Sequence, residues 1–122
     1  FKMQAQGNDY LFFDFSDKNI PAVDFASLSR KFCNRHFGVG ADGIVLISEN
    51  RENDAEMRIF NADGSEAEIC GTALRCVVSY LAEKTGKAKI SVRTKAGIHS
   101  GEVVSDGKYP LIKVEMGKPE FQ

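Results

Sequence analysis

The chain has 122 residues, the size of one domain, of which 43% are hydrophobic and 27% are charged. These fractions are typical of soluble globular domains and argue against a disordered chain or a membrane protein. The 16 basic and 17 acidic residues give a net charge of −1 and form no basic block, so no nucleic-acid partner is expected.

Strand and helix patterns alternate in the first half of the chain. Residues 10–15 are aromatic-rich and predict a strand, and residues 24–37 place apolar side chains at helical spacing, which predicts an amphipathic helix. Residues 44–48 are apolar enough for a buried strand, and residues 55–60 alternate as a further strand does. The polar segment 49–54 between them is a predicted turn.

The segment from Gly71 to Lys84 has almost no polar stripe, and a helix that is apolar nearly all round is a buried helix. Three strand-like stretches separated by turn-forming residues follow it, at 89–94, 98–104 and 110–116. Strands on both sides of a buried helix predict an α+β fold, with a mixed or antiparallel sheet curled around that helix. No linker or internal repeat interrupts residues 1–122, which are expected to form a single domain.

The segment GVGADG at 38–43 matches the dinucleotide-binding pattern G-x-G-x-x-G, and Asp63 follows about 20 residues later, as that pattern requires. The pattern binds pyrophosphate only between a strand and a helix, because the phosphates must meet a helix amino terminus. Here a predicted helix precedes the glycines and a predicted strand follows them. A nicotinamide cofactor is therefore not expected.

The run NADGSEAEICG at 61–71 ends directly before the buried helix. Asn61 and its neighbours are turn formers that can close a hairpin. Cys70 and Gly71 then stand at the helix amino terminus, where unpaired N–H groups and the helix dipole favour an anion such as a thiolate or a carboxylate. Cys70 is thus a candidate catalytic thiol, and the alternative is a small buried hydrophobic residue, the usual fate of a free cysteine.

Three cysteines in a chain without a signal-peptide pattern predict reduced thiols and a cytoplasmic protein with no membrane partner. Cys76 lies within the buried helix and Cys33 on the outer helix, so both are expected to be core residues. His36 and His99 are expected to be structural. With no C-x-x-C motif and no paired histidines, no metal site is expected.

Four motifs together resemble the amino-terminal half of the diaminopimelate epimerases. They are QGNDY near the start, GVGADG before an apolar strand, RIFNADGSEAEICG, and a helix that contains L-R-C. They occur in the family's order and at comparable intervals, and the third is highly specific. The resemblance covers essentially the whole chain and implies a curled sheet wrapped on a central helix.

The resemblance implies an enzyme that uses no cofactor and inverts the α-carbon of an amino acid. In the family, two cysteines from two similar domains face each other across a cleft and convert LL-diaminopimelate into the meso form for lysine and cell-wall synthesis. By this resemblance Cys70 is one of the two acid/base thiols. Asn8 and Asn61 contact the substrate, and the backbone N–H groups of Gly71 and Thr72 bind its α-carboxylate. On composition alone, Asn8 is equally a turn residue.

The implied partners are an amino-acid substrate and the carboxy-terminal domain of the same enzyme, with a homodimer left open. The family's usual run C-G-N-G-A-R-C is CGTALRC here, so Thr72 replaces an asparagine and does not reproduce its amide. A racemase of histidine or proline is therefore the close alternative, and an inactive binding domain is the alternative from another class. The start at Phe1 and the missing second cysteine suggest a truncated chain that is inactive by itself.

Overall fold

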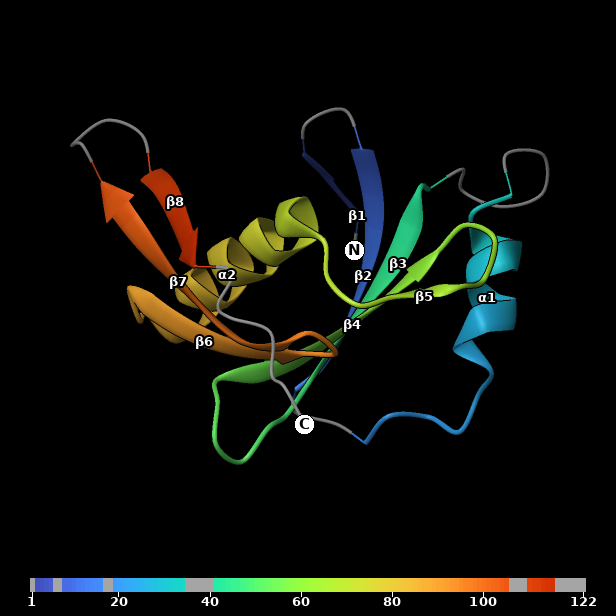
Figure 1. Cartoon of the computed structure of the whole chain (residues 1–122), viewed down its shortest axis with the longest axis horizontal. Coiled ribbons are helices and arrows are strands. Elements are labelled where there is room, and N and C mark those ends of the chain that lie inside the picture. The colour runs from blue at the N-terminus through green and yellow to red at the C-terminus, as the bar shows by residue number, and fades with distance from the viewer. Residues whose placement is uncertain (1, 6–7, 17–18, 35–40, 106–109, 116–122) are drawn as a thin grey trace.

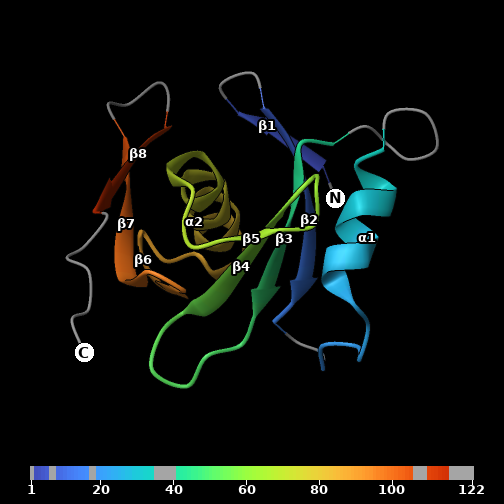
Figure 2. The same ribbon diagram turned by 45° about the vertical axis from the view of Figure 1, so that its right-hand side comes forward.

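The computed structural model describes residues 2–5, 8–16, 19–34, 41–105 and 110–115. Within these ranges an eight-stranded sheet curls around one long helix, α2 (Gly71–Thr85), while a shorter helix, α1 (Phe25–Phe32), covers the opposite face (Figures 1 and 2). We call the face toward α2 the inner face and the face toward α1 the outer face. The predicted α+β fold with a sheet curled around a central helix is confirmed.

The sheet is mixed because its chain crosses over twice. Its strands are β1 (Lys2–Ala5), β2 (Asn8–Phe15), β3 (Gly43–Ser48), β4 (Ala55–Asn61), β5 (Glu66–Ala67), β6 (Lys89–Thr94), β7 (Gly97–Ser105) and β8 (Pro110–Glu115). Their spatial order is β1-β2-β3-β4-β6-β7-β8, with β5 paired to β4. The pairs β2–β3 and β4–β6 are parallel, and each is joined through a helix, as a parallel connection requires.

The elements predicted from the sequence are present, with differences at their ends. Six of the eight strands and both helices were expected, whereas β1 and β5 have only four and two residues, too few to show a strand pattern. The helix predicted over 24–37 is shorter: it ends at Phe32, with Cys33 as its C-cap. The prediction was wrong at this end because it extended the helix to the last apolar residue in phase, Phe37, which lies outside the described residues.

The helix α2 buries most of its apolar side chains against the inner face of the sheet. Its buried residues are Ala73, Leu74, Cys76, Val77, Val78 and Leu81. They meet a row of apolar side chains that lie in register across three strands, Phe12 on β2, Val45 on β3 and Ile59 on β4. Burying a valine or larger aliphatic side chain contributes about 1.5–3 kcal/mol. Burial of α2 is therefore a principal source of stability, and it fixes where the helix begins.

The close approach of α2 to β7 depends on Gly101. A Cβ atom at this position would lie 2.5 Å from Cγ2 and 2.7 Å from Cγ1 of Val78, closer than real Cβ contacts. Both Val78 atoms belong to a branched side chain that is fully buried, so it has little room to move. Only a glycine lets the helix pack directly on this strand.

We expect Gly101→Ala to lower the free energy of unfolding by about 2 kcal/mol, because overpacking a rigid core costs about 1–3 kcal/mol. Val78→Ala alone should also destabilise the chain by leaving a cavity. In the double variant the shorter side chain makes room for the new methyl group, so its loss should be clearly smaller than the sum of the two single losses. Urea unfolding of the wild type, the two single variants and the double variant measures these losses. A double-variant loss within about 0.5 kcal/mol of the sum of the two single losses would contradict the close contact.

A polar network joins the carboxyl-terminal part of α2 to β2. The Asp14 carboxylate accepts hydrogen bonds from the Tyr80 hydroxyl, from Lys84 Nζ at 2.9 Å and from the backbone N–H of Ser16 at 2.9 Å. Burial opposes ionisation of Asp14, but the hydrogen bonds from Ser16, Tyr80 and Lys84 outweigh it and hold the pKa of this carboxyl well below its usual range. The ionised carboxylate thus ties the helix to the strand.

Asp14→Asn should destabilise the chain by about 1–3 kcal/mol at neutral pH, because it removes hydrogen bonds to a charged acceptor. A carboxyl whose pKa is lowered by folding contributes its full stability above its unfolded pKa, about 4, and loses it as the pH falls toward the folded value. The stability difference between the wild type and Asp14→Asn, measured by urea unfolding, should therefore shrink below about pH 4. Tyr80→Phe should show a smaller loss of stability with the same dependence on pH. A stability difference between the wild type and Asp14→Asn that stays constant from neutral pH to pH 2 would contradict the assignment.

Candidate functional site

Cys70 occupies the N-cap of α2. Its backbone is extended (φ −140°, ψ 117°), and its carbonyl oxygen accepts the first helical hydrogen bond, from the Leu74 N–H at 2.9 Å. Among the described residues its thiol makes no side-chain hydrogen bond to the helix cap. Cys70 as a residue is partly exposed, whereas Cys33 and Cys76 are both buried. A group at this position lies at the positive end of the helix dipole, which stabilises a negative charge.

The hairpin between β4 and β5 directs the chain to this position. The backbone N–H of Asn61 donates to the carbonyl of Ser65 at 2.7 Å, and the N–H of Gly64 donates back to the carbonyl of Asn61 at 2.9 Å. Asp63 Oδ1 accepts the Ser65 N–H at 2.9 Å, so Asp63 stabilises the turn. The strand β5 then runs back along β4 and leads within three residues to Cys70. The hairpin expected from the turn formers is confirmed.

The Tyr10 hydroxyl lies 3.2 Å from Cys70 Sγ, although the two residues are 60 positions apart in the sequence. Tyr10 is on the inner face of β2 and is buried, with 9% of its surface exposed. Burial, followed by the hydrogen bond with Cys70 and the charge of that residue, raises the pKa of the Tyr10 hydroxyl well above its usual value. Sequence reasoning missed this contact, because nothing in QGNDY shows that β2 passes the amino terminus of α2.

Of the four predicted substrate-binding residues, two follow Cys70 directly in the sequence and one shares a sheet face with Tyr10. Gly71 and Thr72 are the first two residues of α2, directly after Cys70. Asn61 ends β4 and is exposed, and its Nδ2 donates to Ser65 Oγ at 3.0 Å. Tyr10, Gly43 and Asn61 pair in register across three strands, which places Asn61 on the same sheet face as Tyr10. Asn8 is the first residue of β2, and its side chain lies outside the described part of the structure.

The glycine-rich segment packs strands together at its described end. Gly43 begins β3, where a Cβ atom would lie 2.8 Å from the Phe60 carbonyl oxygen and 3.4 Å from Cε1 of Tyr10. Asp42 next to it accepts the Asp9 N–H through Oδ2 at 2.7 Å, which links the starts of β2 and β3. The helix α1 precedes this segment and β3 follows it, so the order of elements differs from that of a dinucleotide-binding motif, as predicted. Residues 38–40 lie outside the described ranges.

The remaining candidates for metal or proton chemistry are few. In the described part of the chain no three His, Cys, Asp or Glu side chains lie together as metal ligands. His99 is buried on β7 with Nε2 2.9 Å from Thr94 Oγ1, and its Nδ1 has no hydrogen-bond partner within the described residues. His36 lies outside those residues. None of the described helices has the length and apolar character needed to cross a membrane.

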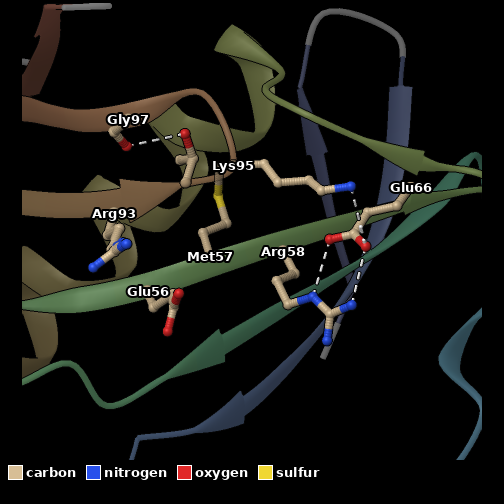
Figure 3. Close-up of a pocket in the computed structure, with 8 residues that line it drawn as sticks. Glu56, Met57, Arg58, Glu66, Arg93, Lys95 and Gly97 are labelled. Carbon is tan, nitrogen blue, oxygen red and sulfur yellow. Dashed lines mark hydrogen bonds and ion pairs between the residues drawn. The ribbon is translucent and has the colours of Figure 1, made fainter. Parts of the chain in front are cut away.

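A surface pocket of about 350 Å³ lies where β4 and β6 diverge (Figure 3). Most of its lining side chains are charged; its residues are Glu56, Met57, Arg58, Glu66, Arg93, Thr94, Lys95 and Gly97. Arg58 forms two hydrogen bonds to Glu66, at 2.9 and 3.0 Å, and Lys95 lies 3.8 Å from the same carboxylate. Glu66 pairs with Phe60, so these ion pairs lie on the outer face, opposite Cys70. The Phe60 ring packs there in a second group of buried residues, which we call the outer core cluster: Phe25, Cys33, Ala41, Ile44, Leu46 and Phe60. This pocket contains no thiol and is separate from the Cys70 site.

We expect iodoacetamide to alkylate Cys70 before the other two cysteines in the folded chain. Cys33 and Cys76 are buried, and burial raises the pKa of both thiols. Mass-spectrometric peptide mapping over a time course gives the order of labelling. The Cys70→Ser variant should lose the fast phase and keep the slow one, and earlier labelling of Cys33 or Cys76 in the folded wild type would show that the site has been misassigned.

Comparison with known proteins matches the whole sequence to one protein family. The sequence model of the family described as "Diaminopimelate epimerase" matches residues 1–122. The chain is 47% identical over 126 residues to the diaminopimelate epimerase of Halothermothrix orenii, covering 99% of this chain and 44% of that protein. It is 46% identical to the diaminopimelate epimerase of Pelotomaculum thermopropionicum, with the same coverage. The chain thus spans less than half the length of these curated relatives.

Two solved structures with a similar fold are a PhzF-family protein and a hydroxyproline epimerase. The phenazine biosynthesis protein of the PhzF family from Bacillus anthracis superposes with a TM-score of 0.66 at 22% identity, over 88% of this chain and 34% of that one. A hydroxyproline epimerase from Agrobacterium vitis, with trans-4-OH-L-proline bound, gives a TM-score of 0.57 at 19% identity, over 83% of this chain and 36% of that one. At these identities the similarity establishes the fold alone.

Proposed function

The chain belongs to the diaminopimelate epimerase family, and we propose that residues 1–122 form the Cys70-bearing domain of an enzyme that interconverts LL- and meso-diaminopimelate. The observation that carries this proposal is the position of Cys70, a partly exposed residue at the amino terminus of α2. A partly exposed thiol at the end of a helix dipole combines access to a substrate with stabilisation of the thiolate.

Inversion of a carbon centre requires a base on one face and an acid on the other, because one group returning its own proton restores the starting isomer. The Cys70 thiolate takes the α-hydrogen as a proton, and a thiol on the opposite face donates a proton to the carbanion. In the reverse direction the two thiols exchange these roles. The second thiol is expected to come from the carboxy-terminal domain of the same enzyme, and two thiols suffice without a cofactor.

The carbanion formed next to the carboxylate is a high-energy species and must be stabilised. The N–H groups at the start of α2, at Gly71 and Thr72, are proposed to donate to the substrate's α-carboxylate, and the helix dipole adds to this stabilisation. Asn8 and Asn61 are proposed to contact the substrate as well. The Asn61 amide bonds Ser65 at the surface, so it can exchange that partner for a substrate group without losing a buried hydrogen bond.

Thr72 supports a second candidate, a racemase of another amino acid such as histidine or proline. Diaminopimelate carries two amino-acid ends, and a threonine hydroxyl is shorter than an asparagine amide and has fewer donors. Comparing turnover of LL-diaminopimelate with turnover of L-histidine and L-proline by the full-length enzyme separates the two candidates. The diaminopimelate proposal requires LL-diaminopimelate to be the preferred substrate.

We expect the isolated 122-residue chain not to epimerise LL-diaminopimelate, because it supplies only one of the two opposed thiols. An open half-site also exposes the substrate to water, which screens the charges that stabilise the carbanion. Polarimetry and loss of α-deuterium from labelled substrate measure turnover. Adding the separately produced carboxy-terminal half should restore it.

Turnover by the isolated chain that survives purification and disappears in Cys70→Ser would overturn the two-domain requirement. A homodimer that brings two Cys70 thiols face to face is a separate case. At concentrations where the chain is mostly monomeric, its signature is a rate that rises with the square of the protein concentration, and a linear dependence there excludes it.

A further inference from the structure

We propose that Tyr10 is a positioning residue for Cys70, whose thiolate accepts a hydrogen bond from the Tyr10 hydroxyl and is thereby stabilised and held at the amino terminus of α2. This inference rests on the proposed function, in which Cys70 is an acid/base thiol. It assigns to β2 a direct part in preparing that thiol.

The hydroxyl is held in place by the packing of its ring. The Tyr10 ring meets Phe12 edge to face, with ring centroids 6.2 Å apart, and lies beside the open backbone of Gly43. The hydrogen bond between Asp9 and Asp42 joins β2 to β3 one residue away. A ring fixed on a buried strand has few alternative rotamers, so the 3.2 Å contact with Cys70 Sγ is a feature of the packed core.

The chemistry of the two groups sets the direction of the hydrogen bond. Burial first, and then the hydrogen bond with Cys70 and the charges of Cys70 and Asp42, raise the pKa of the Tyr10 hydroxyl, so the phenol keeps its proton where a thiol ionises. A thiolate has no proton to donate and therefore accepts. Hydrogen bonds to a charged acceptor are roughly twice as strong as those between neutral groups, so the contact favours the thiolate over the thiol.

The arrangement gives Cys70 two stabilising groups from different parts of the fold. The amino terminus of α2 supplies the helix dipole, and β2 supplies a neutral donor that adds no charge to the site. A lysine or arginine at the Tyr10 position would also stabilise a thiolate, but it would place a permanent charge among buried side chains. Phenylalanine would fill the same space without any effect on the thiol, and this difference makes the proposal testable.

The test is the pH dependence of Cys70 alkylation in the 122-residue chain, followed with iodoacetamide and peptide mapping in the wild type and Tyr10→Phe. Loss of a hydrogen bond to a charged acceptor should move the midpoint of the Cys70 profile upward by about 1 to 2 on the pH scale. At pH values below both midpoints, the rate should fall by about tenfold or more. A merely structural role for the hydroxyl leaves the midpoint unchanged, which would overturn the proposal.

Tyr80→Phe is the matched control, because it removes a hydroxyl that bonds Asp14 on the same sheet face. Its Cys70 profile should coincide with that of the wild type, and an equal shift in this variant would also overturn the proposal. If Tyr10→Phe does not fold, a Tyr80→Phe chain with 3-fluorotyrosine at its remaining tyrosines serves instead. A more acidic phenol is a stronger donor, so the midpoint should move downward, and an unchanged midpoint contradicts the proposal.

The alkylation experiment needs no substrate, so it is independent of the proposed reaction. One pair of results is a Cys70 profile that shifts in Tyr10→Phe and a full-length enzyme that does not act on diaminopimelate. That pair of results would leave the role of Tyr10 intact and refute the proposed function. An unshifted profile in Tyr10→Phe, together with turnover of diaminopimelate by the full-length enzyme, would refute the role of Tyr10 and leave the proposed function intact.

Discussion

Burial of α2 inside the curled sheet is the constraint on which the rest of the structure depends. The helix contacts β6, β7 and β8 on one side and β1 on the other, so strands from both ends of the sheet fix its position. At Gly101 it packs against the strand backbone with no intervening side chain, and through Tyr80 and Lys84 it is bonded to Asp14. A helix held along its length in this way presents a fixed amino terminus, and Cys70 is its N-cap.

The contrast among the three cysteines follows from the same constraint. Cys76 lies one and a half turns into α2, where the packing that holds the helix also buries its thiol. Cys33 closes α1 and packs into the outer core cluster. Only at the N-cap does a thiol combine contact with the core, through Tyr10, with access from outside. Position in the fold, more than residue type, therefore distinguishes the proposed catalytic cysteine.

The predictable parts of this molecule are those that depend on short stretches of sequence. The apolar segment 71–84 predicted its buried helix, and the turn formers after Asn61 predicted the hairpin, because periodicity and turn preferences act between near neighbours. Placing Cys70 at a helix terminus needed only those two elements. The pairing of Tyr10 with Cys70 spans 60 residues and depends on which strands become neighbours, which no local pattern specifies. The bond between Asn61 and Ser65 was also missed, because several turn geometries suit the same residues.

The central claim is that Cys70 is one of two acid/base thiols, and its most direct test is the rate of meso-diaminopimelate formation from the LL isomer by the full-length enzyme carrying Cys70→Ala. Removal of a group that transfers the proton should lower turnover by about 10²-fold or more. Protection of the variant from thermal unfolding by the substrate shows that binding persists, and Cys33→Ala, in the other core cluster, is the control for removal of a thiol. Turnover by Cys70→Ala within about tenfold of the wild type would contradict the account.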